Sequence, residues 1–108
     1  MDERIKNELD LIKESVLKTV PAESIYLFGS YAYGTQSENS DLDIYVVVPD
    51  SIQTHPLDIG AEIRARLYKK RTIPMDLLVG KSSVFNRRKQ SLTLENTIMQ
   101  DGVLLYET

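Results

Sequence analysis

Apolar side chains recur at helical spacing in three stretches of this chain. These stretches are residues 3–19, 57–70 and 92–101. The first presents a single apolar face with positions three and four apart, as in an amphipathic helix, and Pro21 would end it. The second carries two apolar stripes, one through Ile63 and one through Ala61, and the spacing does not decide which one faces the core. Gly102 is placed to cap the third helix.

Four shorter apolar runs predict strands, at residues 24–30, 41–48, 72–80 and 103–107. The run 41–48 is the clearest because it holds three valines, an isoleucine and a tyrosine, which are residues enriched in strands. One helical turn can follow Ser30. Residues 81–91 are polar and basic, and no helix or strand is assigned to them. Helices and strands alternate without a repeat or a linker, so we expect one domain over residues 1–108, of α/β or α+β class, with a small mixed sheet flanked by helices.

Composition narrows the class of protein. Apolar residues make up 42% and charged residues 27% of 108 residues, which is typical of a globular domain. The net charge of −3 argues against a general nucleic-acid binder. The chain has no cysteine, which excludes disulfides, cysteine zinc sites and a cysteine nucleophile. No apolar run approaches the ~18 residues of a membrane span and no signal peptide is visible, so a cytoplasmic location is the default expectation.

Two aspartates stand at the start of the clearest strand. Asp41 and Asp43 are two positions apart, so their side chains point to the same face of the sheet. Carboxylates this close repel each other unless a cation lies between them, and paired hard oxygen ligands suit Mg²⁺. Taken alone, the pair favours the simpler interpretation of two solvated carboxylates at a strand edge.

A Gly-Ser pair and a third acid make a metal and phosphate site more favoured than two solvated carboxylates. Gly29 ends a strand, where a phosphate can approach the backbone closely, and a helical turn starting at Ser30 would point its amide groups at an anion. Asp76 interrupts an apolar strand, and a buried charge is costly unless it is paired or bound to a cation. If that strand lies beside 41–48, Asp76 completes a metal cluster with Asp41 and Asp43. The alternative is an edge-strand charge that opposes aggregation.

Three further residues are secondary candidates for nucleotide binding. Ser40 fits a turn residue that also braces the carboxylate of Asp41. Arg87 and Arg88 lie in the polar stretch and could bind a triphosphate or an acidic partner, although a solvated run of charges is the usual interpretation.

Together these residues resemble a known signature. Gly29-Ser30, then ten residues, then Asp41 and Asp43, with Asp76 downstream, is similar to the motif of the DNA polymerase β-like nucleotidyltransferase superfamily. The short length, the leading helix and the ending "TIMQDGVLLYE" resemble the minimal nucleotidyltransferases. These single-domain proteins are often encoded beside a helical HEPN-domain partner. The resemblance covers nearly the whole chain, and the combined motif is specific although each part is weak.

The resemblance implies a fold and a chemistry. The fold would be a small mixed sheet with the acids on adjacent strands. Two Mg²⁺ ions, held by Asp41, Asp43 and Asp76, would bind ATP, while Gly29 and Ser30 hold its β- and γ-phosphates. Asp76 would help to remove the proton of the attacking hydroxyl. In minimal members paired with HEPN proteins, the implied role is an antitoxin that transfers AMP to a tyrosine of the HEPN ribonuclease.

The resemblance also leaves two alternatives open. Larger relatives carry a second, helical domain that binds the acceptor, and we expect no such domain within these 108 residues. One alternative is a non-catalytic nucleotide-binding module that neutralises a helical partner by contact. The other is a small-molecule nucleotidyltransferase of the drug-modifying kind, with an acceptor cleft between the subunits of a homodimer. None of these functions involves direct binding of nucleic acid or a membrane.

Overall fold

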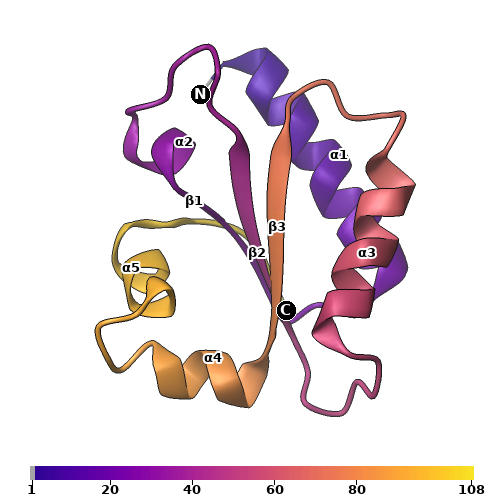
Figure 1. Cartoon of the computed structure of the whole chain (residues 1–108), viewed down its shortest axis with the longest axis vertical. Helices are drawn as coiled ribbons and strands as arrows, with labels where there is room; N and C mark the ends of the chain where they lie inside the picture. The colour runs from indigo at the N-terminus through magenta and orange to yellow at the C-terminus, as the bar shows by residue number, and fades with distance from the viewer. Residues whose placement is uncertain (1) are drawn as a thin grey trace.

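The computed structural model describes residues 2–108 and arranges them around one four-stranded mixed sheet (Figure 1). The strands are β1 (Ser24–Phe28), β2 (Leu42–Val48), β3 (Met75–Lys81) and β4 (Val103–Glu107). The helices are α1 (Glu3–Thr19), α2 (Ser30–Tyr33), α3 (Pro56–Leu67), α4 (Ser82–Arg88) and α5 (Leu94–Asp101). The sheet order is β3-β2-β1-β4, with β1 antiparallel to both neighbours and β2 parallel to β3. The predicted small mixed sheet with flanking helices is confirmed.

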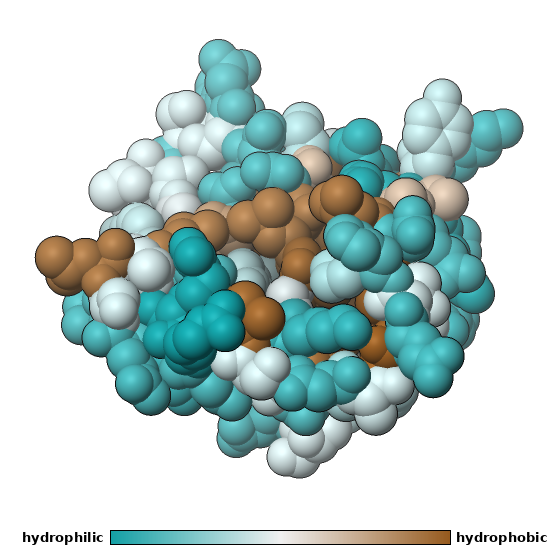
Figure 2. Space-filling view, turned by 60° about the horizontal axis from the view of Figure 1, so that its bottom comes forward, coloured by the Kyte–Doolittle hydropathy of each residue, from teal (hydrophilic) through white to brown (hydrophobic). Residues whose placement is uncertain are grey.

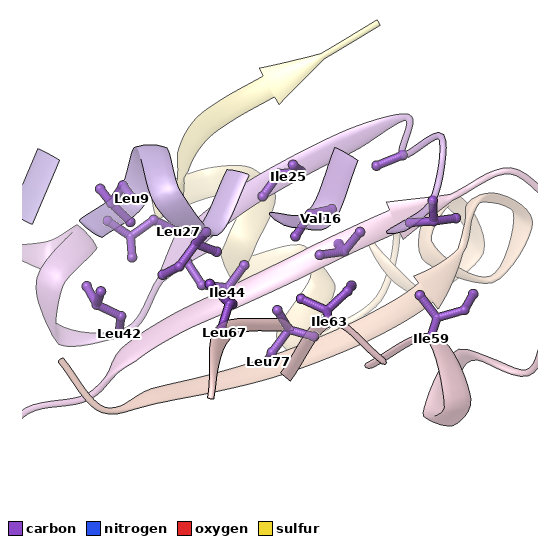
Figure 3. Packing of buried hydrophobic residues seen from close by; sticks show 14 of the residues in the cluster. Leu9, Val16, Ile25, Leu27, Leu42, Ile44, Ile59, Ile63, Leu67 and Leu77 are labelled. Carbon is purple, nitrogen blue, oxygen red and sulfur yellow. The ribbon is translucent and has the colours of Figure 1, made fainter. Parts of the chain in front are cut away.

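The larger part of the core lies between the sheet and the helices α1 and α3. Side chains alternate along β2, so Leu42, Ile44 and Val46 share one face, and all three are fully buried there. They pack with residues of both helices, including Val16 of α1 and Ile63 of α3 (Figure 3). The apolar character of β2 is therefore explained by its central place in the sheet, between β1 and β3.

The structure decides between the two apolar stripes of the second predicted helix. The stripe of Ile59, Ile63 and Leu67 is buried against the sheet. In the other stripe, Leu57 is 73% exposed and Tyr68 is 72% exposed. Only the first stripe belongs to the core.

The opposite face of the sheet is covered by α4 and α5. Tyr45 of β2 is buried there and contacts the ring of Phe85 from α4, with 5.3 Å between ring centroids. Its hydroxyl donates to Glu95 Oε2 of α5 at 3.0 Å, and Arg88 Nε of α4 donates to Glu95 Oε1 at 3.0 Å. Gly80 of β3 makes room for this hydroxyl, because a Cβ at that position would overlap it. This three-residue network joins both helices to β2.

Helix α4 is an element that the sequence did not predict. It occupies the basic stretch 81–91, and only Phe85 in it is buried. The N–H of Ser83 donates to Asp50 Oδ1 at 2.9 Å, so the side chain that caps its first turn comes from a loop 33 residues away. A start signal of this kind cannot be found in the local sequence.

The remaining predicted elements are present with adjusted ends. The strand expected from residue 72 begins at Met75, and the helix expected to residue 70 ends at Leu67. Gly102 caps α5 as predicted, but its backbone is extended, with φ −74° and ψ 165°. A Cβ at Gly102 would press against the carbonyl oxygen of Ile98, which explains the glycine without a left-handed conformation. No helix within residues 2–108 has the length and apolar character that a membrane crossing requires.

The Tyr45 network gives a prediction about stability. In Tyr45→Phe, the buried carboxylate of Glu95 loses one of its donors, so we expect the free energy of unfolding to fall by about 1–2 kcal/mol. Urea unfolding followed by circular dichroism measures the change. Tyr68→Phe is the matched control, because Tyr68 is 72% exposed and should leave stability unchanged. Equal stability of the two variants would contradict the prediction.

Candidate active site

The structure brings the three predicted acids to one end of the sheet. The parallel register pairs Asp43 of β2 with Asp76 of β3, so both side chains leave the same face. Asp41 lies one residue before β2 and two before Asp43. Asp43 is half-buried, whereas Asp41 and Asp76 are exposed. This end of β2 and β3 lies at the top of Figure 1, beside α2.

Because β3 is an edge strand, the exposed Asp76 does not carry the cost of burial that the sequence suggested. Its position opposite Asp43 is what the metal-cluster interpretation requires, and its place on an edge strand is what the alternative interpretation requires. The structure is compatible with both at once.

Gly29 lies directly against the carboxylate of Asp43. Phe28, the last residue of β1, pairs with Asp43 across the antiparallel ladder, and Gly29 follows with φ at 73°. A Cβ on residue 29 would overlap the Asp43 carboxylate, so only glycine fits both the backbone and the space. The sequence predicted Gly29 for phosphate approach alone and missed this contact, which depends on the register of β1 with β2.

The carboxylate of Asp43 sits in an unfavourable electrostatic environment. Partial burial raises the pKa of Asp43 above its ordinary value, and the negative charges of Asp76 and then Asp41 raise it further. A divalent cation at this position would offset both effects, and Mg²⁺ commonly uses one or two carboxylates together with water and substrate phosphates. The donor set therefore fits Mg²⁺.

The carboxylates do not, however, form a complete metal-coordination site by themselves. Among residues 2–108, no three histidine, cysteine, aspartate or glutamate side chains are gathered closely enough to hold a metal ion by themselves. The remaining ligands would be water molecules and, when a nucleotide is bound, its phosphate oxygens, as is usual for Mg²⁺.

The two serine candidates lie next to the acids. Ser30 is the first residue of α2, immediately after Gly29. Ser40 precedes Asp41, and its hydroxyl accepts the N–H of Ser37 at 2.8 Å. Ser40 is therefore a turn residue, as expected, and its hydroxyl is already engaged within the turn.

The two arginine candidates lie elsewhere. Arg87 and Arg88 are in the last turn of α4, which follows the end of β3 opposite to Asp76 (Figure 1). Arg88 lines a hollow of about 550 Å³ at that end of the sheet, together with Tyr45, Lys81 and Glu95. Figure 2 shows this end of the molecule, where apolar residues form a band bordered by polar ones. The structure does not bring either arginine to the acids.

A family model described as "Polymerase beta, Nucleotidyltransferase" matches residues 10–108. The chain belongs to this nucleotidyltransferase family. The match extends over both Asp43 and Asp76 and over the glycine turn that contacts Asp43. The predicted family, and with it the enzyme class of nucleotidyltransferase, is confirmed.

Two curated nucleotidyltransferase relatives are similar in sequence. "Protein adenylyltransferase MntA" of Shewanella oneidensis is 43% identical over 44 residues, which is 41% of this chain and 30% of that protein. "Putative protein adenylyltransferase MJ0604" of Methanocaldococcus jannaschii is 29% identical over 84 residues, which is 78% of each chain. The match to the Shewanella protein thus spans less than a third of its length.

Two solved structures share the fold. A crystal structure from Sulfolobus solfataricus, described as a putative nucleotidyltransferase, superimposes with a TM-score of 0.63 at 24% identity and covers 99% of this chain and 89% of its own. A "toxin-antitoxin with AMP-PNP" crystal structure has a TM-score of 0.59 at 25% identity, covering 93% of this chain and 73% of its own. The nucleotidyltransferase fold therefore extends over nearly all of this chain.

The contact between Gly29 and Asp43 can be tested with a matched pair of glycines. Gly29 and Gly34 have φ values of 73° and 77°, but only Gly29 lacks space for a Cβ. We expect Gly34→Ala to lose about 1–2 kcal/mol of stability from backbone strain alone. Gly29→Ala should lose more and should shift the side-chain ¹³C resonance of Asp43. Indistinguishable effects of the two substitutions on stability and on that resonance would contradict the contact.

The raised pKa of Asp43 predicts a pH-dependent stability. Because the folded form holds this proton to a higher pH than the unfolded chain does, the stability from Asp43 is present below about pH 3.9 and is lost as pH rises through the folded pKa. Without divalent ions, Asp43→Asn should therefore raise the melting temperature at pH 7, and the gain should shrink toward pH 4.

The control for this measurement is Asp10→Asn on the exposed surface of α1, which should show no such gain. Added Mg²⁺ should raise the melting temperature of the wild-type chain and leave that of Asp43→Asn unchanged. A variant less stable than wild type at pH 7 would show that the charge on Asp43 carries no penalty in the fold.

Proposed function

We propose that this protein transfers AMP from ATP to a hydroxyl group of a protein partner, in a Mg²⁺-dependent reaction, and that it acts as an antitoxin. The observation that carries the proposal is the arrangement of Asp43 opposite Asp76 with the Gly29 turn against its carboxylate. That arrangement occurs in a chain of the nucleotidyltransferase family. A half-buried carboxylate whose pKa is raised by burial and by the charges of two further acids is the environment that a divalent ion would stabilise.

Asp41, Asp43 and Asp76 would hold one or two Mg²⁺ ions with the triphosphate. Bound there, Mg²⁺ supplies charge stabilisation to the attacking and leaving oxygens of the displacement. The backbone at Gly29 and the hydroxyl of Ser30 would bind the β- and γ-phosphates, since this turn lies directly against the Asp43 carboxylate that would hold Mg²⁺.

The reaction itself is a displacement at the α-phosphorus. The acceptor oxygen forms a bond to phosphorus while the bond to pyrophosphate breaks, and pyrophosphate leaves with the electron pair. The proton of the acceptor hydroxyl passes to Asp76, whose exposed carboxylate faces solvent and can release it. Positioning of the two reactants by the acids and the turn would supply much of the rate.

The acceptor is proposed to be a tyrosine of a helical HEPN-type toxin. The names of the two sequence relatives are those of protein adenylyltransferases, and one structural relative is a toxin-antitoxin complex with an ATP analogue. These names favour a protein acceptor over a small molecule, and adenine over other bases.

A second candidate function is a non-catalytic module that neutralises its partner by contact. It is favoured by one observation, that the described residues do not gather three metal ligands in advance. The two candidates differ in whether neutralisation of the partner depends on the carboxylates.

Label transfer from ATP tests the proposal. Purified protein is mixed with Mg²⁺ and a lysate of its host, once with α-labelled and once with γ-labelled ATP. We expect a protein band labelled only from the α-position, and a loss of about 100-fold or more in Asp43→Asn. Asp10→Asn should label as wild type. No band with any of the four nucleotides, together with partner neutralisation retained in Asp43→Asn, would overturn the proposal in favour of the module.

A further inference from the structure

Glu8 is a buried carboxylate on the apolar face of α1. Its relative exposure is 5%, and the neighbouring positions on that face, Ile5, Leu9 and Ile12, all belong to the core. A buried carboxylate destabilises a protein unless donors surround it. The carboxylate of Glu8 therefore requires hydrogen-bond donors from another part of the chain.

The donors come from the segment that leads into β3. Glu8 Oε2 accepts the N–H of Thr72 at 2.7 Å and the N–H of Ile73 at 2.8 Å. Its other oxygen, Oε1, accepts the hydroxyl of Thr72 at 3.2 Å. One side chain thus fixes two consecutive backbone amides of the α3–β3 connection, 64 and 65 residues away along the chain.

The fixed segment continues directly into the acid site. The carbonyl of Pro74 accepts the N–H of Leu42 at 2.9 Å, and Leu42 lies between Asp41 and Asp43. The next residue, Met75, is the register partner of Leu42, and Asp76 is the register partner of Asp43. From Glu8 to the acids there are therefore two hydrogen-bonded steps, through Thr72–Pro74 and then Leu42.

This end of the β2–β3 ladder is where the strands need support. Asp43 and Asp76 carry like charges on adjacent strands, which favours separation of the strand ends. β3 is at the edge of the sheet, so within residues 2–108 its one strand neighbour is β2. Glu8, buried on the core-facing side of α1, is placed to oppose that separation.

We infer that Glu8 is a positioning residue, which holds the start of β3 in register with β2 and thereby sets the distance between the carboxylates of Asp43 and Asp76 for divalent-cation binding. The inference rests on the metal-binding part of the proposed function, because it assigns Glu8 a role in the same site. Glu8 is buried and its carboxylate is hydrogen-bonded to Thr72 and Ile73, so it would act on the site through the Thr72–Pro74 segment.

Binding of Mn²⁺ without nucleotide tests the inference. Mn²⁺ affinity is measured by electron paramagnetic resonance, at a temperature well below the melting temperature of every variant. In Glu8→Gln, an amide NH₂ replaces one acceptor oxygen facing the donors, and we expect about 10-fold weaker Mn²⁺ binding. Hydrogen exchange at the amide of Leu42 should accelerate in the same variant. Glu14→Gln is the matched control, since Glu14 is exposed on the same helix and pairs with Lys18.

Thr72→Val keeps Glu8 and removes only the hydroxyl contact, so it replaces Glu8→Gln in the test if that variant does not fold. We expect it to weaken Mn²⁺ binding by less than the ~10-fold of Glu8→Gln. Wild-type Mn²⁺ affinity in the folded variants, or unchanged exchange at Leu42, would overturn the inference and leave Glu8 a purely structural residue. A wild-type chain that binds no Mn²⁺ would overturn it as well. A wild-type chain that binds Mn²⁺ but transfers no nucleotide would reject the proposed function while this inference stands.

Discussion

The candidate active site is built on the parallel pairing of β2 with β3. This pairing sets Asp43 beside Asp76, and it does so only because β2 is apolar enough to be buried on both faces in the middle of the sheet. A shift of one residue in this register would turn Asp76 to the opposite face, where the core lies. The position of the acids thus depends on the same hydrophobic pattern that determines the fold. A substitution that changed the register of β2 with β3 would also move Asp76 away from Asp43.

The same strand separates two environments on one face. At its start, Asp43 is half-buried among other acids, and two residues later Tyr45 is buried beneath α4 and α5. In Tyr45, burial and the nearby charge of Glu95 raise the pKa of the phenol, so the hydroxyl stays protonated and donates. At the start of β2, the charges of the acids lower the stability of the fold. Two residues later, the packing of Tyr45 beneath α4 and α5 offsets that loss.

Much of this arrangement could be predicted from the sequence, because it rests on local periodicity. The helix over residues 3–19, the strand over 41–48 and the common face of Asp41 and Asp43 all follow from spacing within a few residues. Contacts that depend on long-range register could not be predicted in this way. They include the fit of Gly29 against Asp43, the capping of α4 by Asp50 and the hydrogen bonds of Glu8. One local signal for Glu8 did exist, since it stands three positions after Ile5 and four before Ile12 on an otherwise apolar stripe.

The close fit of Gly80 against the Tyr45 hydroxyl has an evolutionary consequence. The two residues lie on neighbouring strands and share a single volume, so neither can change alone without a cost. A larger residue at position 80 would push the Tyr45 hydroxyl away from Glu95. If position 45 had already lost its hydroxyl, the same larger residue would cause a smaller steric clash. Homologous chains should therefore exchange these two positions as a pair, with Gly80 retained wherever a tyrosine occupies position 45. The order of substitution matters, because the tyrosine hydroxyl has to be lost before the glycine can be replaced.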